Sequence, residues 1–357
     1  MQIYWRCSKS SGVFPMATKI ADIAKAANVS SAAVSLALSG KKGVSEENRS
    51  RILQIAKDLK YQQNKIQNLT NPSSNGTILF LRIARHGHTV NRDHDVFIAD
   101  YIDGLSEGST TFGYNMIINS FRAISVPKVI ESISGIKYQG IIVLGTELSV
   151  EDFTAFEALD IPIVFIDTFQ DYLQFDFVDM NNIDGIFKMV NYFVQQGYKN
   201  IGFLRSNVKT GNFRLRFEAF KGITKFLNLK IDSESIITVD STFNGAYEDM
   251  KEYLNTNPPL PDSLVSSNDI MAYGVIKALN EFNISVPDDI SIIGFDNLPL
   301  SSIMNPPLTT IKVSKHEIGK TAIRLIHNRI HGDTNAPPVK VLIGGELIIR
   351  DSVKPKK

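Results

Sequence analysis

The sequence has one cysteine and one tryptophan, Cys7 and Trp5, and both lie within its first fifteen residues. A single cysteine excludes an internal disulfide framework. No apolar run reaches the roughly 18 residues that a membrane-spanning helix needs. The first fifteen residues also lack the central apolar run of a signal peptide. We therefore expect a chain that stays in the cytoplasm and has no membrane partner, with residues 1–15 forming an N-terminal extension.

Several motifs of common enzyme classes are absent as well. The 357 residues contain no Gly-x-x-x-x-Gly-Lys phosphate loop, no Gly-x-Gly-x-x-Gly dinucleotide motif and no His-Glu-x-x-His metal motif. Scattered acidic residues do not by themselves indicate catalysis. We expect neither an enzyme nor a bound cofactor.

The net charge of the chain is only +1, but its charge is unevenly distributed. Residues 16–70 contain nine Lys or Arg and four Asp or Glu, whereas residues 71–357 contain 27 and 33. A small basic head on an acidic body is typical of a protein that binds nucleic acid through the head. A solvated charged helix, such as residues 46–60, is the alternative explanation.

Three short helices are predicted in the head. Apolar residues recur at helical spacing in 19–28, in 31–38 and in the segment after Ser45. Ser30 is a plausible N-cap of the second helix, and Ser45 is one for the third. The tight turn between the first two helices predicts a helix-turn-helix over residues 16–61. A generic three-helix bundle is the alternative.

The head resembles that of the lactose-repressor family of bacterial transcription regulators. The resemblance is carried by Asp22, Ile23, Ala24, Ala27, Val29, Ser30, Val34, Ser35, Leu38, Gly40, Val44, Ser45, Arg49, Ile52, Ala56, Leu59 and Tyr61. It implies that the second helix enters the DNA major groove. The implied DNA-binding residues of the head are Lys19, Ser30, Ser31, Ala32, Ala33, Ser35 and Leu36.

Residues 29–40 contain no Arg, Lys, Asn or Gln, the side chains that most often bind base edges. Alanine and leucine side chains can contact thymine methyl groups, and Ser31 can form a hydrogen bond. We therefore expect a largely apolar contact with the bases. Affinity for DNA would come from cations near phosphates, and the candidates are Lys19, Lys25, Lys41, Lys42 and Arg49.

Residues 62–76 are polar, lack a core pattern and end in Pro, Ser, Asn and Gly, so they are predicted to form a hinge or linker. In the resembling family this segment forms a short helix on operator DNA that wedges a leucine into the minor groove. The resemblance assigns Asn64, Lys65 and Leu69 to that contact. A plain flexible tether is the alternative.

Residues 77–357 alternate between apolar runs of strand length and amphipathic helical segments, which predicts parallel sheets covered by helices. The number of units exceeds one sheet of ordinary width, so we expect two sheets. The strands are predicted in TILFLRI, YNMIINS, GIIVLG, IPIVFID, NIGFLR, SIITVD, SLVSS and ISIIGFD.

The motifs of this body resemble the effector-binding core of the same family, which shares the fold of type I periplasmic sugar-binding proteins. They include GIIVLGTEL, IPIVFIDT, SNDIMAYGVIKAL, VPDDISIIGFDN and PPLTTIKV. The resemblance implies an α/β body with two lobes, three chain crossings between them and a ligand in the cleft. Carried over by residue, the effector-binding candidates are Arg216, Asp296, Asn268, Phe97, Phe169 and Phe243.

The segment 82–95, RIARHGHTVNRDHD, allows three interpretations. His86, His88, His94, Asp93 and Asp95 could bind a metal, contact the effector or belong to a solvated loop. None of its ligand pairs has the i, i+4 spacing of a helical metal site, and no cysteine is nearby. We therefore expect no metal there.

The resemblance implies a DNA-binding transcription regulator, a repressor of a carbohydrate-utilisation operon. It would act as a homodimer on operator DNA and respond to a small effector, a sugar or sugar phosphate. A sugar-binding transport protein is the alternative, but it would not need a basic head and would carry a signal peptide.

Overall fold

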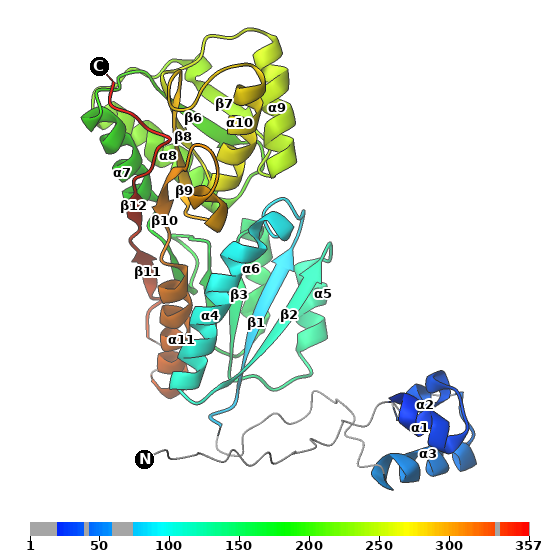
Figure 1. Cartoon of the computed structure of the whole chain (residues 1–357). Helices are drawn as coiled ribbons and strands as arrows, with labels where there is room; N and C mark the ends of the chain where they lie inside the picture. The colour runs from blue at the N-terminus through cyan, green and yellow to red at the C-terminus, as the bar shows by residue number, and fades with distance from the viewer. Residues whose placement is uncertain (1–19, 39–42, 59–73, 333–335, 357) are drawn as a thin grey trace, which may run out of the picture. The chain divides into compact units, whose positions relative to one another are not determined.

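The computed structural model describes residues 20–38, 43–58, 74–332 and 336–356. It divides the chain into two compact units, residues 1–69 and 70–357, which are drawn in Figure 1. The predicted Lys19 and the hinge residues Asn64, Lys65 and Leu69 lie outside the described residues, as does the N-terminal extension.

The first unit contains the three predicted helices, α1 (Ile20–Ala27), α2 (Ser31–Leu38) and α3 (Glu46–Asp58). The Ser30 hydroxyl accepts a hydrogen bond from the Ala33 amide at 3.2 Å, so Ser30 is the N-cap of α2 as predicted. One small core holds the helices together because each helix turns its apolar positions inward. The buried residues of this core are Ile23, Ala24, Ala27, Val34, Ala37, Ile52 and Ala56.

The second unit contains two six-stranded sheets, which confirms the predicted α/β body. The first sheet is entirely parallel, and in the second only the edge strand β12 is antiparallel. The first sheet has the order β11 (Lys340–Ile343), β5 (Asp176–Met180), β4 (Ile163–Ile166), β3 (Gly140–Leu144), β1 (Thr77–Ala84), β2 (Asn115–Arg122). The second has the order β12 (Glu346–Ile348), β10 (Thr309–Lys312), β9 (Ser291–Asp296), β8 (Ser263–Ser266), β6 (Ile201–Ser206), β7 (Ile236–Val239).

Each sheet and the helices packed on it form one lobe. The first lobe carries α4 (Asp95–Thr111), α5 (Val126–Ile133), α6 (Val150–Thr154) and α11 (Lys315–His331). The second carries α7 (Asn182–Gln195), α8 (Gly211–Phe226), α9 (Phe243–Asn255) and α10 (Asp269–Glu281). The chain passes between the sheets after β5, after β10 and after β11, so the three predicted crossings are confirmed.

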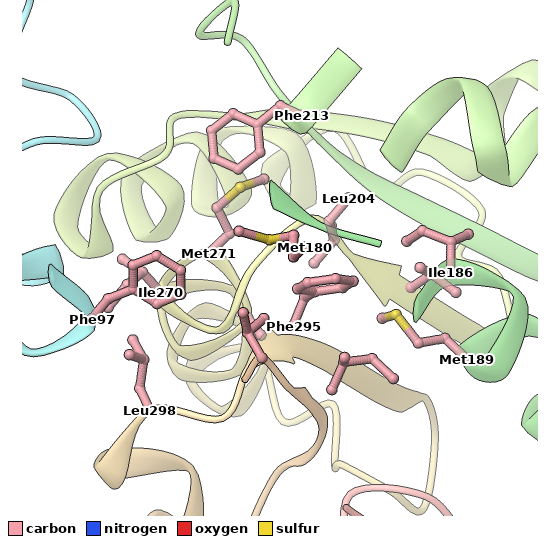
Figure 2. Close-up of a cluster of buried hydrophobic side chains, with 14 of the residues drawn as sticks. Phe97, Met180, Ile186, Met189, Leu204, Phe213, Ile270, Met271, Phe295 and Leu298 are labelled. Carbon is pink, nitrogen blue, oxygen red and sulfur yellow. The ribbon is translucent and has the colours of Figure 1, made fainter. Parts of the chain in front are cut away.

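One large buried cluster spans both lobes, and a second fills the outer face of the first sheet. Figure 2 shows part of the spanning cluster, with Phe97 of α4, Met180 at the end of β5 and Phe295 of β9. Because residues of both sheets belong to this one cluster, it ties the two lobes together.

Helices α4 and α11 lie side by side in Figure 1, and two glycines permit their close approach. A Cβ atom on Gly104 would lie 2.0 Å from the His316 carbonyl oxygen, and one on Gly319 would lie 2.6 Å from the Tyr101 carbonyl oxygen. Residues 104–108, Gly-Leu-Ser-Glu-Gly, match the spacing of a hydrolase nucleophile elbow, which requires a strand-to-helix turn. Here they lie inside α4, with Ser106 exposed on the helix surface, so the match has no catalytic geometry.

Candidate functional sites in the head and between the lobes

Helix α2 presents small side chains along its accessible side. Ser30 and Ser31 are exposed and Ala33 and Leu36 are half-buried, whereas Val34 and Ala37 face the head core. The side chains of Ala32 and Ser35 lie outside the described part of the chain. A Cβ atom on Gly43 would lie 3.3 Å from Leu36 Cδ1, so Leu36 also packs against the turn that follows α2. The accessible side chains of α2 therefore end in hydroxyl and methyl groups, as the sequence indicates.

Arg49 has a structural role that the sequence did not reveal. Its guanidinium donates hydrogen bonds to the carbonyl oxygens of Ala37 at 3.1 Å and Leu36 at 3.5 Å, and it lies 3.5 Å from the Glu46 carboxylate. A cation at these last carbonyls caps the C-terminus of α2. The geometry therefore gives Arg49 the task of fixing α2 on α3, and the predicted phosphate contact of Arg49 stays a prediction.

A small cavity of about 40 Å³ lies between the two lobes. Four of the six predicted effector residues, Phe97, Arg216, Asn268 and Asp296, meet in its wall. The other lining residues are Thr89, His94, Ile98, Thr146, Asp167, Thr210, Asn212 and Phe213. Apart from His94, none of them was predicted from the sequence. Thr89, Thr146, Asp167 and Thr210 lie in short loops, whereas Ile98, Asn212 and Phe213 lie in the first turns of α4 and α8.

The Arg216 side chain is buried and makes contacts on every side. Its Nε donates to Asn182 Oδ1 at 2.8 Å, and its Nη1 donates to the Ser267 carbonyl oxygen at 2.5 Å. The guanidinium carbon lies 3.8 Å from the centre of the Phe295 ring. The remaining Nη2 donates to Met180 Sδ at 2.8 Å and lies 3.7 Å from Asp296 Oδ1, which is longer than a hydrogen bond. Arg216 is thus held rigidly, with Nη2 facing Asp296 in the cavity wall.

Asp296 is buried at the end of β9, and its Oδ1 has no hydrogen-bond donor within the described part of the chain. Burial raises the pKa of Asp296 to about 8, although the nearby Arg216 charge acts in the opposite direction. The backbone of Asp296 adopts a φ of +119°, a region that L-residues rarely occupy. A buried acceptor without a donor, in strained backbone and beside a cavity, is typical of a ligand-binding position.

A second carboxyl group, Asp167, lies on the first-lobe side of the cavity. It accepts hydrogen bonds from Tyr101 Oη at 3.0 Å, from Asn212 Nδ2 at 3.2 Å and from the Thr146 hydroxyl. Burial raises the pKa of Asp167, against the effect of the Thr146 and Tyr101 hydrogen bonds. Because Asn212 belongs to α8 of the second lobe, this network joins the two lobes beneath the cavity.

The loop from His86 to Val90 is built around one carboxylate, Glu147. Its Oε2 accepts the backbone N–H groups of His86 at 2.9 Å and Gly87 at 3.0 Å. Its Oε1 accepts those of Thr89 at 2.8 Å and Val90 at 2.7 Å, together with the Thr89 hydroxyl at 3.0 Å. Burial alone would raise the pKa of Glu147, but the backbone N–H groups outweigh it and lower the pKa to about 2. The ionised Glu147 therefore fixes the shape of this loop.

The same loop reaches across to the second lobe, and we call residues 86–94 the clasp. His88 Nδ1 lies 3.1 Å from Asp240 Oδ2, and the His88 carbonyl oxygen accepts the Ser241 hydroxyl at 3.0 Å. Asp93 accepts the backbone N–H of Phe243 at 3.3 Å. These contacts join the clasp of the first lobe to residues 240–243 of the second lobe.

His94 forms the inner end of the clasp and is buried in the cavity wall. Its Nε2 lies 3.3 Å from Asn268 Nδ2 of the second lobe, and its Nδ1 lies 3.1 Å from Asn91 Oδ1. Burial lowers the pKa of His94 to about 4, against the charges of Asp93 and Glu147, so the ring is neutral at pH 7. Of the three interpretations of segment 82–95, contact with the cavity describes His94, whereas His86 and His88 are held by carboxylates at the rim.

The structure does not bring the other two predicted aromatic residues to the cavity. Phe169 is half-buried against the first-lobe core, with its ring centre 6.2 Å from that of Phe177. Phe243 begins α9 and lines a separate surface hollow with Tyr273 and Lys277. Both follow strands or turns near the cavity. The local sequence pattern does not predict the direction in which their side chains point.

No group of three or more His, Cys, Asp or Glu side chains in ranges 20–38, 43–58, 74–332 and 336–356 is arranged to hold a metal ion. No helix in those ranges is long and apolar enough to cross a membrane.

Comparisons with known proteins agree with this architecture. Residues 19–64 match a model of the bacterial regulatory proteins of the lacI family, and residues 190–353 match a periplasmic binding protein-like domain. The HTH-type transcriptional repressor PurR of Histophilus somni is 29% identical over 344 residues, which cover 95% of this chain and 99% of that protein.

Solved structures share the fold over nearly the whole chain. A complex of the transcriptional regulator CelR with cellobiose has a TM-score of 0.70 at 18% identity and covers 94% of this chain and 99% of its own. A lac repressor dimer bound to operator and the anti-inducer ONPF has a TM-score of 0.69 at 21% identity. The match covers 95% of this chain and 99% of the lac repressor chain. A helix-turn-helix head that matches the lacI regulatory proteins, joined to a periplasmic binding protein-like body, identifies the chain as a DNA-binding transcription regulator.

Proposed function

We propose that this regulator is a repressor controlled by an uncharged, polyhydroxylated effector such as a sugar, bound in the interlobe cavity. The observation that carries the proposal is the buried Asp296 Oδ1, which lines the cavity and has no donor among the described residues. A ligand hydroxyl supplies the missing donor. The fixed Arg216 edge beside it would donate to a neighbouring hydroxyl oxygen.

The cavity chemistry favours a neutral sugar over a sugar phosphate. Arg216 is the one cation among the described lining residues, and it already faces Asp296. Lys315 lies close by, but its Nζ is 3.0 Å from the Asp100 carboxylate and 3.2 Å from the Asp296 carbonyl oxygen. Burial raises the pKa of both Asp167 and Asp296, which indicates that this wall disfavours negative charge, and a buried phosphate would be costly there. The threonine hydroxyls and asparagine amides suit hydroxyl groups instead.

Effector binding would be coupled to opening of the lobes. The cavity is far smaller than the roughly 300–1,000 Å³ of ordinary ligand pockets, so a sugar enters only when the clasp separates from the second lobe. The open and closed arrangements would then bind the effector with different free energies. This difference in binding free energy sets the largest change in DNA affinity that the effector can produce.

A homodimer is part of the proposal. Leu300 and Ile303 are exposed at 43% and 78% on the second lobe, beside the apolar hollow that contains Met304. Exposed neighbouring apolar side chains indicate a surface that binds a partner. The lac repressor, which shares the fold, is a dimer on its operator. Two heads in one dimer would contact two half-sites of an operator.

A sugar-binding transport protein remains the second candidate, and the test of function separates the two. The full chain is titrated onto operator-containing and unrelated duplexes, and its thermal stability is followed with panels of neutral sugars and sugar phosphates. The proposal expects salt-dependent DNA binding and stabilisation by a neutral sugar. Sugar binding without DNA binding would instead support transport, and stabilisation by sugar phosphates alone would contradict a neutral effector.

Leu36→Ala is expected to weaken specific operator binding while leaving non-specific binding nearly unchanged. The substitution removes a methyl-bearing contact from α2 but alters no charge, and non-specific affinity is mainly electrostatic. A mismatched base pair costs about 1–3 kcal/mol, and we expect the loss of one apolar base contact to lie near the lower end of that range. Fluorescence anisotropy with operator and scrambled duplexes measures both affinities. An equal fall in the two would mean that Leu36 acts through its packing against Gly43.

Asp296→Asn is expected to stabilise the effector-free protein increasingly as pH rises. The folded protein holds a proton on Asp296 up to a pKa of about 8, against an ordinary value of 3.8. Its native state therefore binds more protons than the unfolded state, and wild-type stability falls between these two values as pH rises. The amide has no such dependence. Thermal unfolding at pH 5, 7 and 9 should show that the melting temperature of the variant rises relative to that of the wild type as pH increases. A difference in melting temperature that does not change with pH would contradict the raised pKa of Asp296.

A further inference from the structure

Two histidines on one face of α11 form a cluster outside the cleft and the head. His327 and His331 are separated by one helical turn, and their ring centres lie 4.5 Å apart. His327 Nδ1 lies 3.0 Å and His331 Nε2 lies 3.2 Å from the same atom, the Tyr114 hydroxyl oxygen. One nitrogen of each imidazole therefore points to a common position.

The surroundings hold this arrangement while leaving it accessible. The His327 ring stacks on Phe112 with ring centres 4.2 Å apart and planes 21° apart, which fixes its orientation. Tyr114 is buried and follows α4 directly before β2, whereas His331 is exposed. The cluster thus has a rigid inner side and an open outer side through which an ion can enter.

We propose that His327 and His331 bind a divalent transition-metal ion of the zinc, nickel or copper group. Imidazole nitrogens are the preferred protein ligands of these ions, and a pair at i, i+4 places both nitrogens on one side of a helix. The Tyr114 hydroxyl and water molecules complete the coordination. With two histidines and no thiolate or carboxylate in the described cluster, the site is weaker and more open than a structural zinc site.

The site lies where the chain enters the body. The Phe112 carbonyl oxygen accepts a hydrogen bond from Asn75 Nδ2 at 2.8 Å, and the Gly113 carbonyl oxygen accepts one from the Asn75 backbone N–H at 2.8 Å. Asn75 directly precedes Gly76 and the start of β1. An ion on the cluster would clamp the end of α11 to the α4–β2 turn that holds this segment, and would stabilise the first lobe.

The test uses the full chain with Cys7→Ser, which removes the one thiol, and titrates ZnCl2 and NiCl2 by isothermal calorimetry at neutral pH. We expect one ion per chain and a raised melting temperature with the ion present. His331→Gln should weaken binding by at least the roughly 10–100-fold that loss of even an outer-shell partner costs. His316→Gln is the matched control, because His316 is an exposed histidine on the same helix, paired with Glu107.

Two results would overturn the proposal. One is the absence of binding at millimolar metal, which would make the cluster a hydrogen-bonded Tyr–His–His chain. The other is equal binding in His331→Gln and His316→Gln, which would place the ion elsewhere. Since His331 is exposed, its replacement leaves the core intact, and unchanged melting without metal checks this.

Discussion

Arg216→Ala is expected to abolish the effector's influence on operator binding and to cost more stability than any other substitution in the cavity wall. Arg216 donates hydrogen bonds to Asn182 and to the Ser267 carbonyl oxygen, so its removal leaves two buried acceptors without a donor. Each buried acceptor that loses its donor costs about 1–3 kcal/mol. The effector would also lose a fixed planar guanidinium donor.

The measurement has two parts. Urea unfolding gives the free energy of unfolding, and operator anisotropy with and without the identified sugar gives the effector response. Arg205→Ala is the matched control, because Arg205 is an exposed arginine on the same lobe whose guanidinium lies over Phe217. Arg216→Lys keeps the charge without the planar fork, so it should fold yet respond weakly. A full effector response in Arg216→Lys and Arg216→Ala would remove Arg216 from the site.

Glu147→Gln is expected to unfold the clasp locally and to weaken effector binding without touching the effector. The two oxygens of Glu147 together accept four backbone N–H groups, and a glutamine amide would face some of them with donors of its own. The pKa of Glu147 falls from 4.5 to about 2 on folding, which corresponds to about 3 kcal/mol of stability at neutral pH. Because the folded pKa is lowered, this contribution is present above pH 4.5 and is lost as pH falls toward 2.

Urea unfolding of wild type and variant across pH 7 to 3 checks the sign. The difference should be about 3 kcal/mol at pH 7 and should shrink below pH 4.5. Glu131→Gln, an exposed carboxylate on α5 of the same lobe, is the control and should change little. A Glu147 effect that is independent of pH would contradict the ionised anchor. Normal effector binding despite lost stability would show that the clasp does not shape the cavity.

The helices of the head and the strand–helix alternation of the body could be predicted because both depend on local periodicity. The Ser30 cap, the apolar spacing of α1 and the buried runs of β1 and β3 are each contained within a few consecutive residues. Strand β5 was not among the predicted strands, because its sequence Asp-Phe-Val-Asp-Met buries two acids. Only tertiary partners make this tolerable: Arg329 pairs with Asp176, and Asn212 donates to Asp179.

The candidate site also has one part that the sequence predicts and one part that only the tertiary structure shows. The sequence, through its resemblance to the lactose-repressor family, determined the head, the two-lobed body and the convergence of Arg216, Asp296, Asn268 and Phe97. The tertiary structure decided what local pattern cannot encode. Glu147 meets its loop across about 60 residues and Tyr114 meets His327 across 213, while Phe169 and Phe243 turn away from the cavity. Periodicity constrains a side chain only relative to its own helix or strand, whereas its partner is set by how the sheets and crossings bring distant segments together.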